Sequence, residues 1–211
     1  MKIDKLGWLV AALLLGVLFG SGFDDGPLKI AVADITSIVE KSEFGKKNQD
    51  DFKAMKSARE GVLEFIDQYR VLSVQQATDI RDLSIKPAAL TAEEKSKLDR
   101  IKADVIAARK KNDELAQKPN LTPEERKLLE EYANQAANME QTAQEWLRVF
   151  TNDLQAWADK QKLESLNRAR ASVQEVGKAQ GFTVVLELGI APYGANDITE
   201  AALKAMNAKK N

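Results

Sequence analysis

The stretch Gly181–Met206, GFTVVLELGIAPYGANDITEAALKAM, decides the fold of this chain. Its first eight residues are rich in β-branched and apolar side chains, which is typical of a β-strand. The preceding residues, back to Pro123, contain no further proline and carry a helical pattern. Because a strand is not stable by itself, the fold depends on where its partner strands lie.

A second strand pattern lies near the other end of the chain, in LKIAVADI (Leu28–Ile35). Ile30 and Val32 alternate there with two alanines, which is the period of two expected of a strand. A short helix is predicted after it, from about residue 36 to residue 42. This is the only strand-like run in the N-terminal half, so it is the natural partner of the C-terminal strand.

A heptad pattern fills residues 44–84 and predicts one continuous helix that packs along another. Lys86-Pro87 interrupts this helix, because proline lacks a backbone donor. A second helix is predicted to start after Thr91, which forms a capping box with Glu94. Seven of the ten seam positions of the first helix are apolar, and the ten are Phe52, Met55, Arg59, Val62, Ile66, Tyr69, Ser73, Gln76, Ile80 and Leu83.

The strongest helix boundary is QKPNLTPEER, in which Pro119-Asn120 suits a turn. Thr122 is predicted to cap the next helix, Pro123 to occupy its first position and Glu125 to complete a capping box. This helix is predicted to reach about Gln180, and Gly181 suits the left-handed position just beyond a helix end. Its seam positions are Leu129, Tyr132, Ala136, Met139, Ala143, Trp146, Phe150 and Trp157.

The helix lengths predict a chain that runs out and comes back. Residues 44–180 are predicted to form a long antiparallel coiled-coil hairpin, with a kink near 85–91 and a tip near 118–122. Such a hairpin returns residues 181–211 to residues 23–43, and the two segments form one small head. The fold class is therefore predicted as α+β and mostly helical, with a small β head and a long helical hairpin.

The predicted head has too few strands to be stable within one chain, and its open edges are apolar. Several copies of the chain are therefore predicted to pool their strands, which makes the protein a homo-oligomer with a shared head. The residues predicted to form this oligomeric head are Ile30, Val32, Phe182, Val184, Leu186, Leu188 and Tyr193.

Composition excludes several classes of chemistry. The 211 residues include no cysteine and no histidine, which excludes disulfides, thiol catalysis, Cys/His zinc sites and Ser-His-Asp catalysis. The net charge of −1 does not favour a nucleic-acid partner. Three acidic pairs are interpreted as surface charges, because adjacent side chains on a helix point about 100° apart: Glu93-Glu94, Glu124-Glu125 and Glu130-Glu131. A protein that is not an enzyme and needs no cofactor or metal is predicted.

Residues 1–22 have the features of an export signal. Two lysines precede an apolar run from Leu6 to Phe19, which ends on Gly20-Ser21-Gly22. The run is shorter than the roughly 20 residues that span a bilayer, so a signal peptide cleaved before about Phe23 is predicted. The alternative is an uncleaved N-terminal anchor, which would be the only membrane contact. Both interpretations place the remaining chain outside the cytoplasm.

The two ends of the chain resemble the Skp/OmpH family of periplasmic chaperones. The resemblance rests on Leu28–Met55, for the opening strand, the short helix and the start of the long helix, and on Gly181–Met206. It implies a homotrimer with a shared β-barrel-like head, from which helical hairpins hang like tentacles around a cavity. It also implies ATP-independent holding of unfolded outer-membrane proteins in the periplasm, without a cofactor.

The same resemblance implies a second short strand that ends in Tyr193. The final helix is predicted to be capped by Asp197, with Glu200 in the reciprocal position. Two features depart from the family. The hairpin is longer than in the compact members by the segment between Pro87 and Pro123, and residues 85–145 here contain 11 Lys/Arg and 12 Asp/Glu, whereas the best-known members are strongly basic. Electrostatic attraction of the distal hairpin to acidic clients or lipopolysaccharide is therefore not expected here.

The most aromatic patch of the long C-terminal helix is a candidate for client contact, and it consists of Trp146, Phe150, Leu154 and Trp157. Trp146 and Phe150 match the heptad seam and are interpreted as packing between the limbs. Leu147 and Leu154 fall off the seam and are predicted to contact clients. A second function is compatible with the same helical hairpin. The protein would then be an extracytoplasmic coiled-coil structural or adaptor protein that binds one folded partner.

Overall fold

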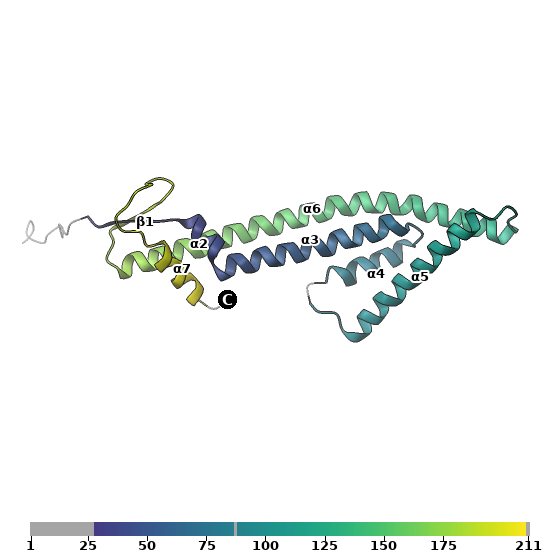
Figure 1. The fold of residues 1–211 in the computed structure, drawn as a ribbon, viewed down its shortest axis with the longest axis horizontal. Coiled ribbons are helices and arrows are strands. Elements are labelled where there is room, and N and C mark those ends of the chain that lie inside the picture. Colours follow the sequence, from purple (N-terminus) through teal and green to yellow (C-terminus); the bar gives the residue numbers. More distant parts are fainter. Residues whose placement is uncertain (1–27, 87, 210–211) are drawn as a thin grey trace, which may run out of the picture. The chain divides into compact units, whose positions relative to one another are not determined.

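The computed structural model describes residues 28–86 and 88–209 and divides into two compact units (Figure 1). We call the first unit the head, with described residues 28–42 and 167–209, and the second unit the arm, Glu43–Leu166. Helices account for 76% of the described residues and the sheet has two strands, so the chain is a mostly helical α+β protein, as predicted. The predicted export signal lies outside the described residues.

The head contains the two predicted strands side by side. β1 (Ile30–Ala33) and β2 (Val184–Glu187) are parallel, with Ile30 opposite Val184 and Val32 opposite Leu186. The other edge of β1 is occupied by its own chain, because the Val32 N–H donates to the Asn196 carbonyl at 2.8 Å and the Ile198 N–H donates to the Val32 carbonyl at 2.9 Å. β1 is therefore an inner strand, and fewer sheet edges are open than the sequence led us to expect.

Two short helices and the end of a long one pack around this sheet. α2 (Ile35–Lys41) is capped by Asp34, whose carboxylate accepts a hydrogen bond from the Ser37 N–H at 2.8 Å. α7 (Thr199–Ala208) is tied to the same corner, because the Asp34 N–H donates to the Thr199 hydroxyl at 2.8 Å. Ile38 and Ala202, each 0% exposed, lie in the core that these helices close over the sheet.

The long helix α6 (Pro123–Ala179) ends at Gly181, which has a φ of +71°. The Gly181 N–H donates to the Lys178 carbonyl at 3.1 Å and the Phe182 N–H donates to the Gly177 carbonyl at 2.9 Å, which is a Schellman motif. The prediction for Gly181 is confirmed. Gly177 has a separate role, because a β-carbon there would lie 3.0 Å from a methyl group of Val185, so glycine lets β2 approach α6 closely.

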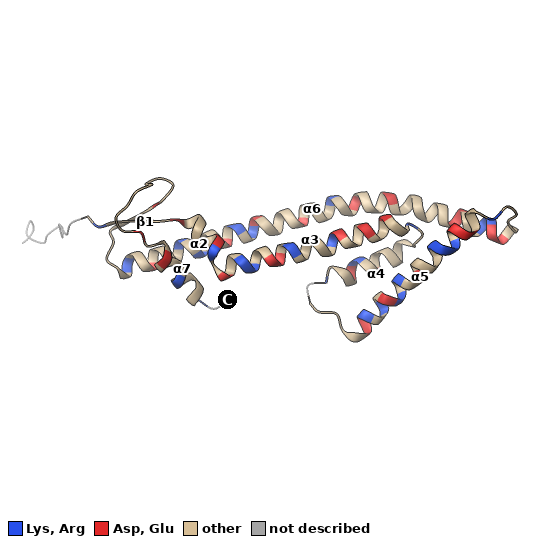
Figure 2. Ribbon diagram, in the orientation of Figure 1, with Lys and Arg blue, Asp and Glu red and all other residues tan. Residues whose placement is uncertain are grey.

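In the arm, α3 (Glu43–Tyr69) runs antiparallel to the arm portion of α6. Residues further along α3 contact residues that lie earlier in α6, as expected of antiparallel helices. Asn48 donates to Ser165 at 3.3 Å, the rings of Phe52 and Trp157 lie 6.1 Å apart, and the guanidinium of Arg59 lies 5.6 Å from the centre of the Phe150 ring. Figure 2 shows acidic and basic residues interspersed along both helices.

The prediction of one continuous helix over residues 44–84 is wrong. α3 ends at Tyr69, Arg70 adopts a left-handed conformation with a φ of 54°, and α4 (Val74–Ser84) begins after Ser73. Ser73 and Gln76 form a capping box. Val71 and Leu72, between the helices, are 3% and 0% exposed. A straight helix would point these adjacent side chains about 100° apart, whereas the break buries both.

The predicted kink near residues 85–91 is a reversal of direction. α4 packs against both α3 and α5 (Ala92–Ala116), and Figure 1 shows it running back along α3. The Asp79 carboxylate lies 3.3 Å from the Lys97 ammonium on α5, and the Arg81 guanidinium lies 4.7 Å from the centre of the Trp146 ring on α6. Four helices thus share one core at this level, formed by Val62, Ile66, Leu72, Ala77, Ile80, Leu98, Val105, Met139, Trp146 and Phe150.

The left-handed residue between α3 and α4 gives a first testable prediction. Arg70→Gly is expected to be more stable than Arg70→Ala by about 1 kcal/mol, because glycine adopts a positive φ without the steric cost that alanine shares with arginine. Both variants lose the exposed ion pair of Arg70 with Asp67, so their comparison isolates the backbone. Urea denaturation measures the difference. Equal stabilities would mean that residue 70 is not left-handed in solution.

The two predicted helix starts in the arm are confirmed. Thr91 accepts a hydrogen bond from the Glu94 N–H at 3.2 Å, and the Glu94 carboxylate accepts one from the Thr91 N–H at 2.9 Å. Thr122 and Glu125 form the same reciprocal pair at 3.2 and 3.0 Å, directly before Pro123 opens α6. Both starts rest on local hydrogen bonds, which explains why the sequence alone located them.

Candidate functional site

Five large apolar side chains of the head are exposed, and we call them the head patch: Leu28, Ile30, Val184, Ile190 and Tyr193. Ile30 and Val184 lie opposite each other in the sheet, so their side chains lie on the same face. Ile190 and Tyr193 are the most exposed, at 78% and 89%. A β-carbon on Gly194 would lie 2.6 Å from a methyl group of Val32, so the loop that carries them passes over this same face.

The residues predicted to form an oligomeric head differ in exposure. Ile30, Val184 and Tyr193 belong to the head patch. Phe182, Leu186 and Leu188 are half-buried. Val32 is 2% exposed and lies under Gly194 of its own chain, so its side chain is already covered within one subunit. Leu28 and Ile190 were not singled out from the sequence, although Leu28 continues the alternation of Ile30 and Val32 by one more step.

The expected second strand ending in Tyr193 does not form. The Ile190 and Ala191 N–H groups both donate to the Glu187 carbonyl, at 2.9 and 3.0 Å, so the chain turns at the end of β2. Pro192 follows directly and has no N–H to offer a sheet. Because of this turn, Ile190 and Tyr193 lie on a loop and not in a β-strand, which explains their high exposure.

The predicted capping box of the last helix does not form, because the N-cap of α7 is Ile198, which makes no side-chain capping bond, and Asp197 lies one residue earlier. The Asp197 carboxylate accepts hydrogen bonds from the side chain and the N–H of Thr199, the latter at 2.8 Å. These bonds lower the pKa of Asp197. Glu200 does not complete a capping box, because the residue at the helix boundary is Ile198 and Glu200 faces the Lys41 ammonium at 3.9 Å. The helix starts one residue later than predicted, which moves Glu200 from the third helical position to the second.

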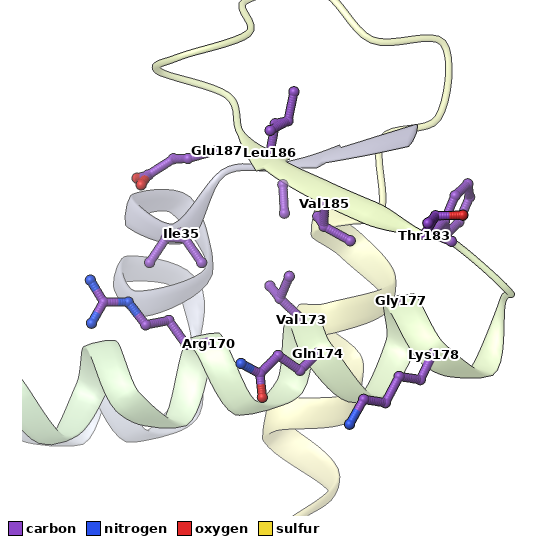
Figure 3. A pocket seen from close by; sticks show the side chains of 12 residues that line it. Ile35, Arg170, Val173, Gln174, Gly177, Lys178, Thr183, Val185, Leu186 and Glu187 are labelled. Carbon is purple, nitrogen blue, oxygen red and sulfur yellow. The ribbon is translucent and has the colours of Figure 1, made fainter. Parts of the chain in front are cut away.

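A pocket of about 370 Å³ lies between β2 and α6, and we call it the edge groove (Figure 3). The side chains of Val173, from α6, and Val185, from β2, line it from opposite sides. Arg170 and Lys178 lie on α6 at its two ends. The remaining lining residues are Ala33, Ile35, Gln174, Gly177, Phe182, Thr183, Leu186 and Glu187. The groove combines an apolar floor with two basic side chains at its rim.

On the arm, the side chains predicted to pack between helices are less exposed than those predicted to contact clients. Trp146 and Phe150 are 8% and 4% exposed and belong to the arm core, so their interpretation as packing residues is correct. Leu147 is 57% exposed and Leu154 is half-buried. These two leucines are thus accessible to a bound chain, whereas the neighbouring aromatic residues are not.

Two acidic residues that belong to the adjacent pairs of the arm, Glu94 and Glu125, have structural partners. Glu94 accepts hydrogen bonds from the Lys86 ammonium at 2.6 Å and from Thr91, and these lower the pKa of Glu94. Glu125 has the same arrangement with the Lys118 ammonium at 2.7 Å and Thr122, which lowers its pKa too. Residues 28–86 and 88–209 contain no group of three acidic side chains placed to hold a metal ion.

Within the same described ranges, no helix has the length and apolar character needed to cross a bilayer. Comparison with known proteins found no family model that matches the chain, and no matching curated protein or solved structure. The head patch, the edge groove and the arm are the surfaces of this chain that can carry a function.

Proposed function

We propose that this protein is an ATP-independent holdase chaperone of the periplasm, which binds unfolded outer-membrane proteins and prevents their aggregation. The observation that carries the proposal is the head patch. Large apolar side chains gathered on one face are rare on monomeric proteins and mark surfaces that another molecule covers. In this proposal the covering molecules are further copies of the chain, which meet as a homotrimer with a shared head.

The arm supplies the client-binding surface in this proposal. Each arm, an antiparallel pairing of α3 and α6 thickened by α4 and α5, acts as one tentacle, and the tentacles of three copies enclose a cavity. Mixed charges keep this surface soluble (Figure 2). Leu147 and Leu154 offer apolar contacts between these charges. Weak contacts of this kind hold many unfolded chains without selecting one conformation, and no cofactor takes part.

Export to the periplasm is the part of the proposal that rests on sequence alone, on the apolar run Leu6–Phe19. After cleavage the chain is free in the periplasm, whereas a retained segment anchors it to the inner membrane. N-terminal sequencing of exported protein distinguishes the two, because cleavage leaves a new terminus near Phe23.

A second candidate function is an extracytoplasmic coiled-coil structural or adaptor protein that binds one folded partner. The observation that favours it is the four-helix core of the arm, which holds Ile66, Ile80 and Met139 at 0–1% exposure. Such a core makes this part of the arm rigid, and a rigid surface is better suited than a flexible one to binding a folded partner.

Aggregation of a urea-unfolded β-barrel membrane protein distinguishes the two functions. We expect the protein to suppress light scattering after dilution of the client at about one trimer per client. Leu147→Gln with Leu154→Gln is expected to weaken suppression several-fold, because apolar contacts that form only with the client are lost. Ile106→Gln, another exposed arm position at 47%, is the matched control. No suppression by the unaltered protein would favour the adaptor.

A further inference from the structure

We propose that the edge groove binds an extended segment of the client, which pairs with β2 as an added strand and places an apolar side chain, flanked by acidic residues, in the pocket. This inference deepens the proposed function and rests on it, because the ligand is a segment of an unfolded chain. It assigns the head a second role besides joining the subunits.

The backbone of β2 is available for such pairing on one side. The Val184 N–H donates to the Lys29 carbonyl at 3.3 Å and the Leu188 N–H donates to the Ala33 carbonyl at 3.0 Å. Even-numbered residues of β2 therefore face β1, and in a parallel ladder the residues between them face the other way. Val185 thus directs its N–H and carbonyl toward the outer edge, where the described residues provide no strand.

The same residue forms the floor of the groove. Figure 3 shows the Val185 side chain on the side of the sheet that α6 covers, and one of its methyl groups lies close to Gly177. A strand added beside β2 would lie over α6 and direct every second side chain into the groove. The volume of about 370 Å³ is at the small end of ligand pockets, which span about 300–1,000 Å³. It suits one large apolar side chain better than a whole folded surface.

The rim sets the charge of the segment. Arg170 and Lys178 are eight residues apart on α6, which is about 12 Å along the helix axis. An extended chain covers that distance in about four residues. Side chains two positions before and two positions after the apolar residue in the pocket lie on the same face of the bound strand, so acidic residues there fall near the two cations. In the described part of the chain neither cation has an ion-pair partner. Glu187 lies at the Arg170 end of the groove, so Lys178 is the stronger anchor.

The groove and the head patch are separate surfaces, which leaves the groove open when subunits join through the patch. The patch includes Ile30 and Val184, whose side chains lie on one face of the sheet. The groove includes Val185, whose side chain lies on the opposite face, toward α6. An acidic segment is therefore favoured as occupant over a second copy of the chain.

Binding of fluorescent peptides to the full-length protein tests the inference. The probe is a ten-residue peptide with Asp-x-Phe-x-Asp at its centre. The comparison peptides carry Lys in place of both Asp, or proline directly before Phe. We expect the acidic peptide to bind at least about tenfold more tightly than either, because the rim is basic and proline removes a ladder donor. Amide exchange at Val185 is expected to slow when the acidic peptide binds.

Variants of the rim complete the test. Arg170→Glu with Lys178→Glu is expected to weaken binding of the acidic peptide about tenfold or more and to strengthen that of the Lys peptide. Lys160→Glu with Lys204→Glu makes the same charge change at exposed positions outside the groove and is expected to leave both affinities unchanged. Equal effects of the two double variants would overturn the inference, as would unchanged exchange at Val185.

Two further readouts separate this inference from the proposals on which it rests. If the rim variant changes the oligomer mass, the groove is a contact between copies and the inference is wrong. If the unaltered protein suppresses client aggregation but does not bind the acidic peptide, the holdase function stands and the groove assignment fails. If it binds the peptide as expected without suppressing aggregation, the groove is a peptide site and the holdase proposal fails.

Discussion

Replacing Ile30 with Lys and Val184 with Glu is expected to convert the proposed homotrimer into monomers. The two positions lie opposite each other on the exposed face of the sheet. Opposite charges placed directly across a ladder support the strand pair, so the head is expected to stay folded. Placing these charges in a covered apolar surface costs at least about 3 kcal/mol, which raises the dissociation constant about a hundredfold or more.

Light scattering coupled to size exclusion measures this effect at micromolar concentration. Val74→Lys with Ile106→Glu is the matched control, because both positions are exposed apolar sites on the arm, and it is expected to keep the oligomer. Circular dichroism checks that each variant remains folded. An oligomer that persists in the head variant would mean that the head patch is not the interface, and a monomeric unaltered protein would remove the trimer from the proposal.

Leu72→Ala is expected to destabilise the arm by about 2–5 kcal/mol, because the side chain is fully buried and its removal leaves a cavity. Leu72 lies in the turn between α3 and α4 and belongs to the four-helix core. Val74→Ala, two residues away, is expected to cost less than about 0.5 kcal/mol, because Val74 is 53% exposed. Urea denaturation compares the two variants.

This pair of variants also tests the course of the chain. In a single straight helix over residues 44–84, Leu72 would lie beside the seam of Tyr69, Ser73 and Gln76 instead of on it, so its truncation would cost little. Equal small effects of both substitutions would therefore favour the straight helix that the heptad pattern predicted, and would contradict the folded-back α4.

The strand pairing and the helix starts were predictable because their signals are short and specific. The alternation in Ile30 and Val32 marks β1, and the pairs Thr91 with Glu94 and Thr122 with Glu125 mark two helix starts by hydrogen bonds within four residues. Each of these signals depends on neighbours in the sequence, so no knowledge of the tertiary structure was required.

The folded-back α4 was missed because a heptad pattern shows that a helix packs against another helix but does not identify that helix. Ile80 follows the seam of α3 in phase, although it faces the core from a separate helix. The lengths held a clue. The predicted outgoing limb, residues 44–118, was about 17 residues longer than the returning one, residues 123–180. Helices of 27 and 25 residues out, with one of 11 back, give a net reach of 41 residues, which is close to the 44 residues of α6 that belong to the arm.

The edge groove had no signal in the sequence. Arg170 and Lys178 look like ordinary surface charges of a long helix, and Val185 looks like any strand residue. They line one pocket only because Gly177 brings β2 close to α6. That proximity depends on the Schellman turn at Gly181 and on the pairing with β1, so it is a product of the assembled head.

The position of β1 between β2 and Asn196–Ile198 has a consequence for biogenesis. Both neighbours of this strand follow the arm in the sequence, about 150 residues after β1, so during synthesis β1 emerges first and stays unpaired until the whole arm has been made. The helices of the arm need only nearby residues and acquire structure in the meantime. A chain truncated before residue 180 would leave β1 with both edges bare, and such fragments are expected to aggregate or be degraded.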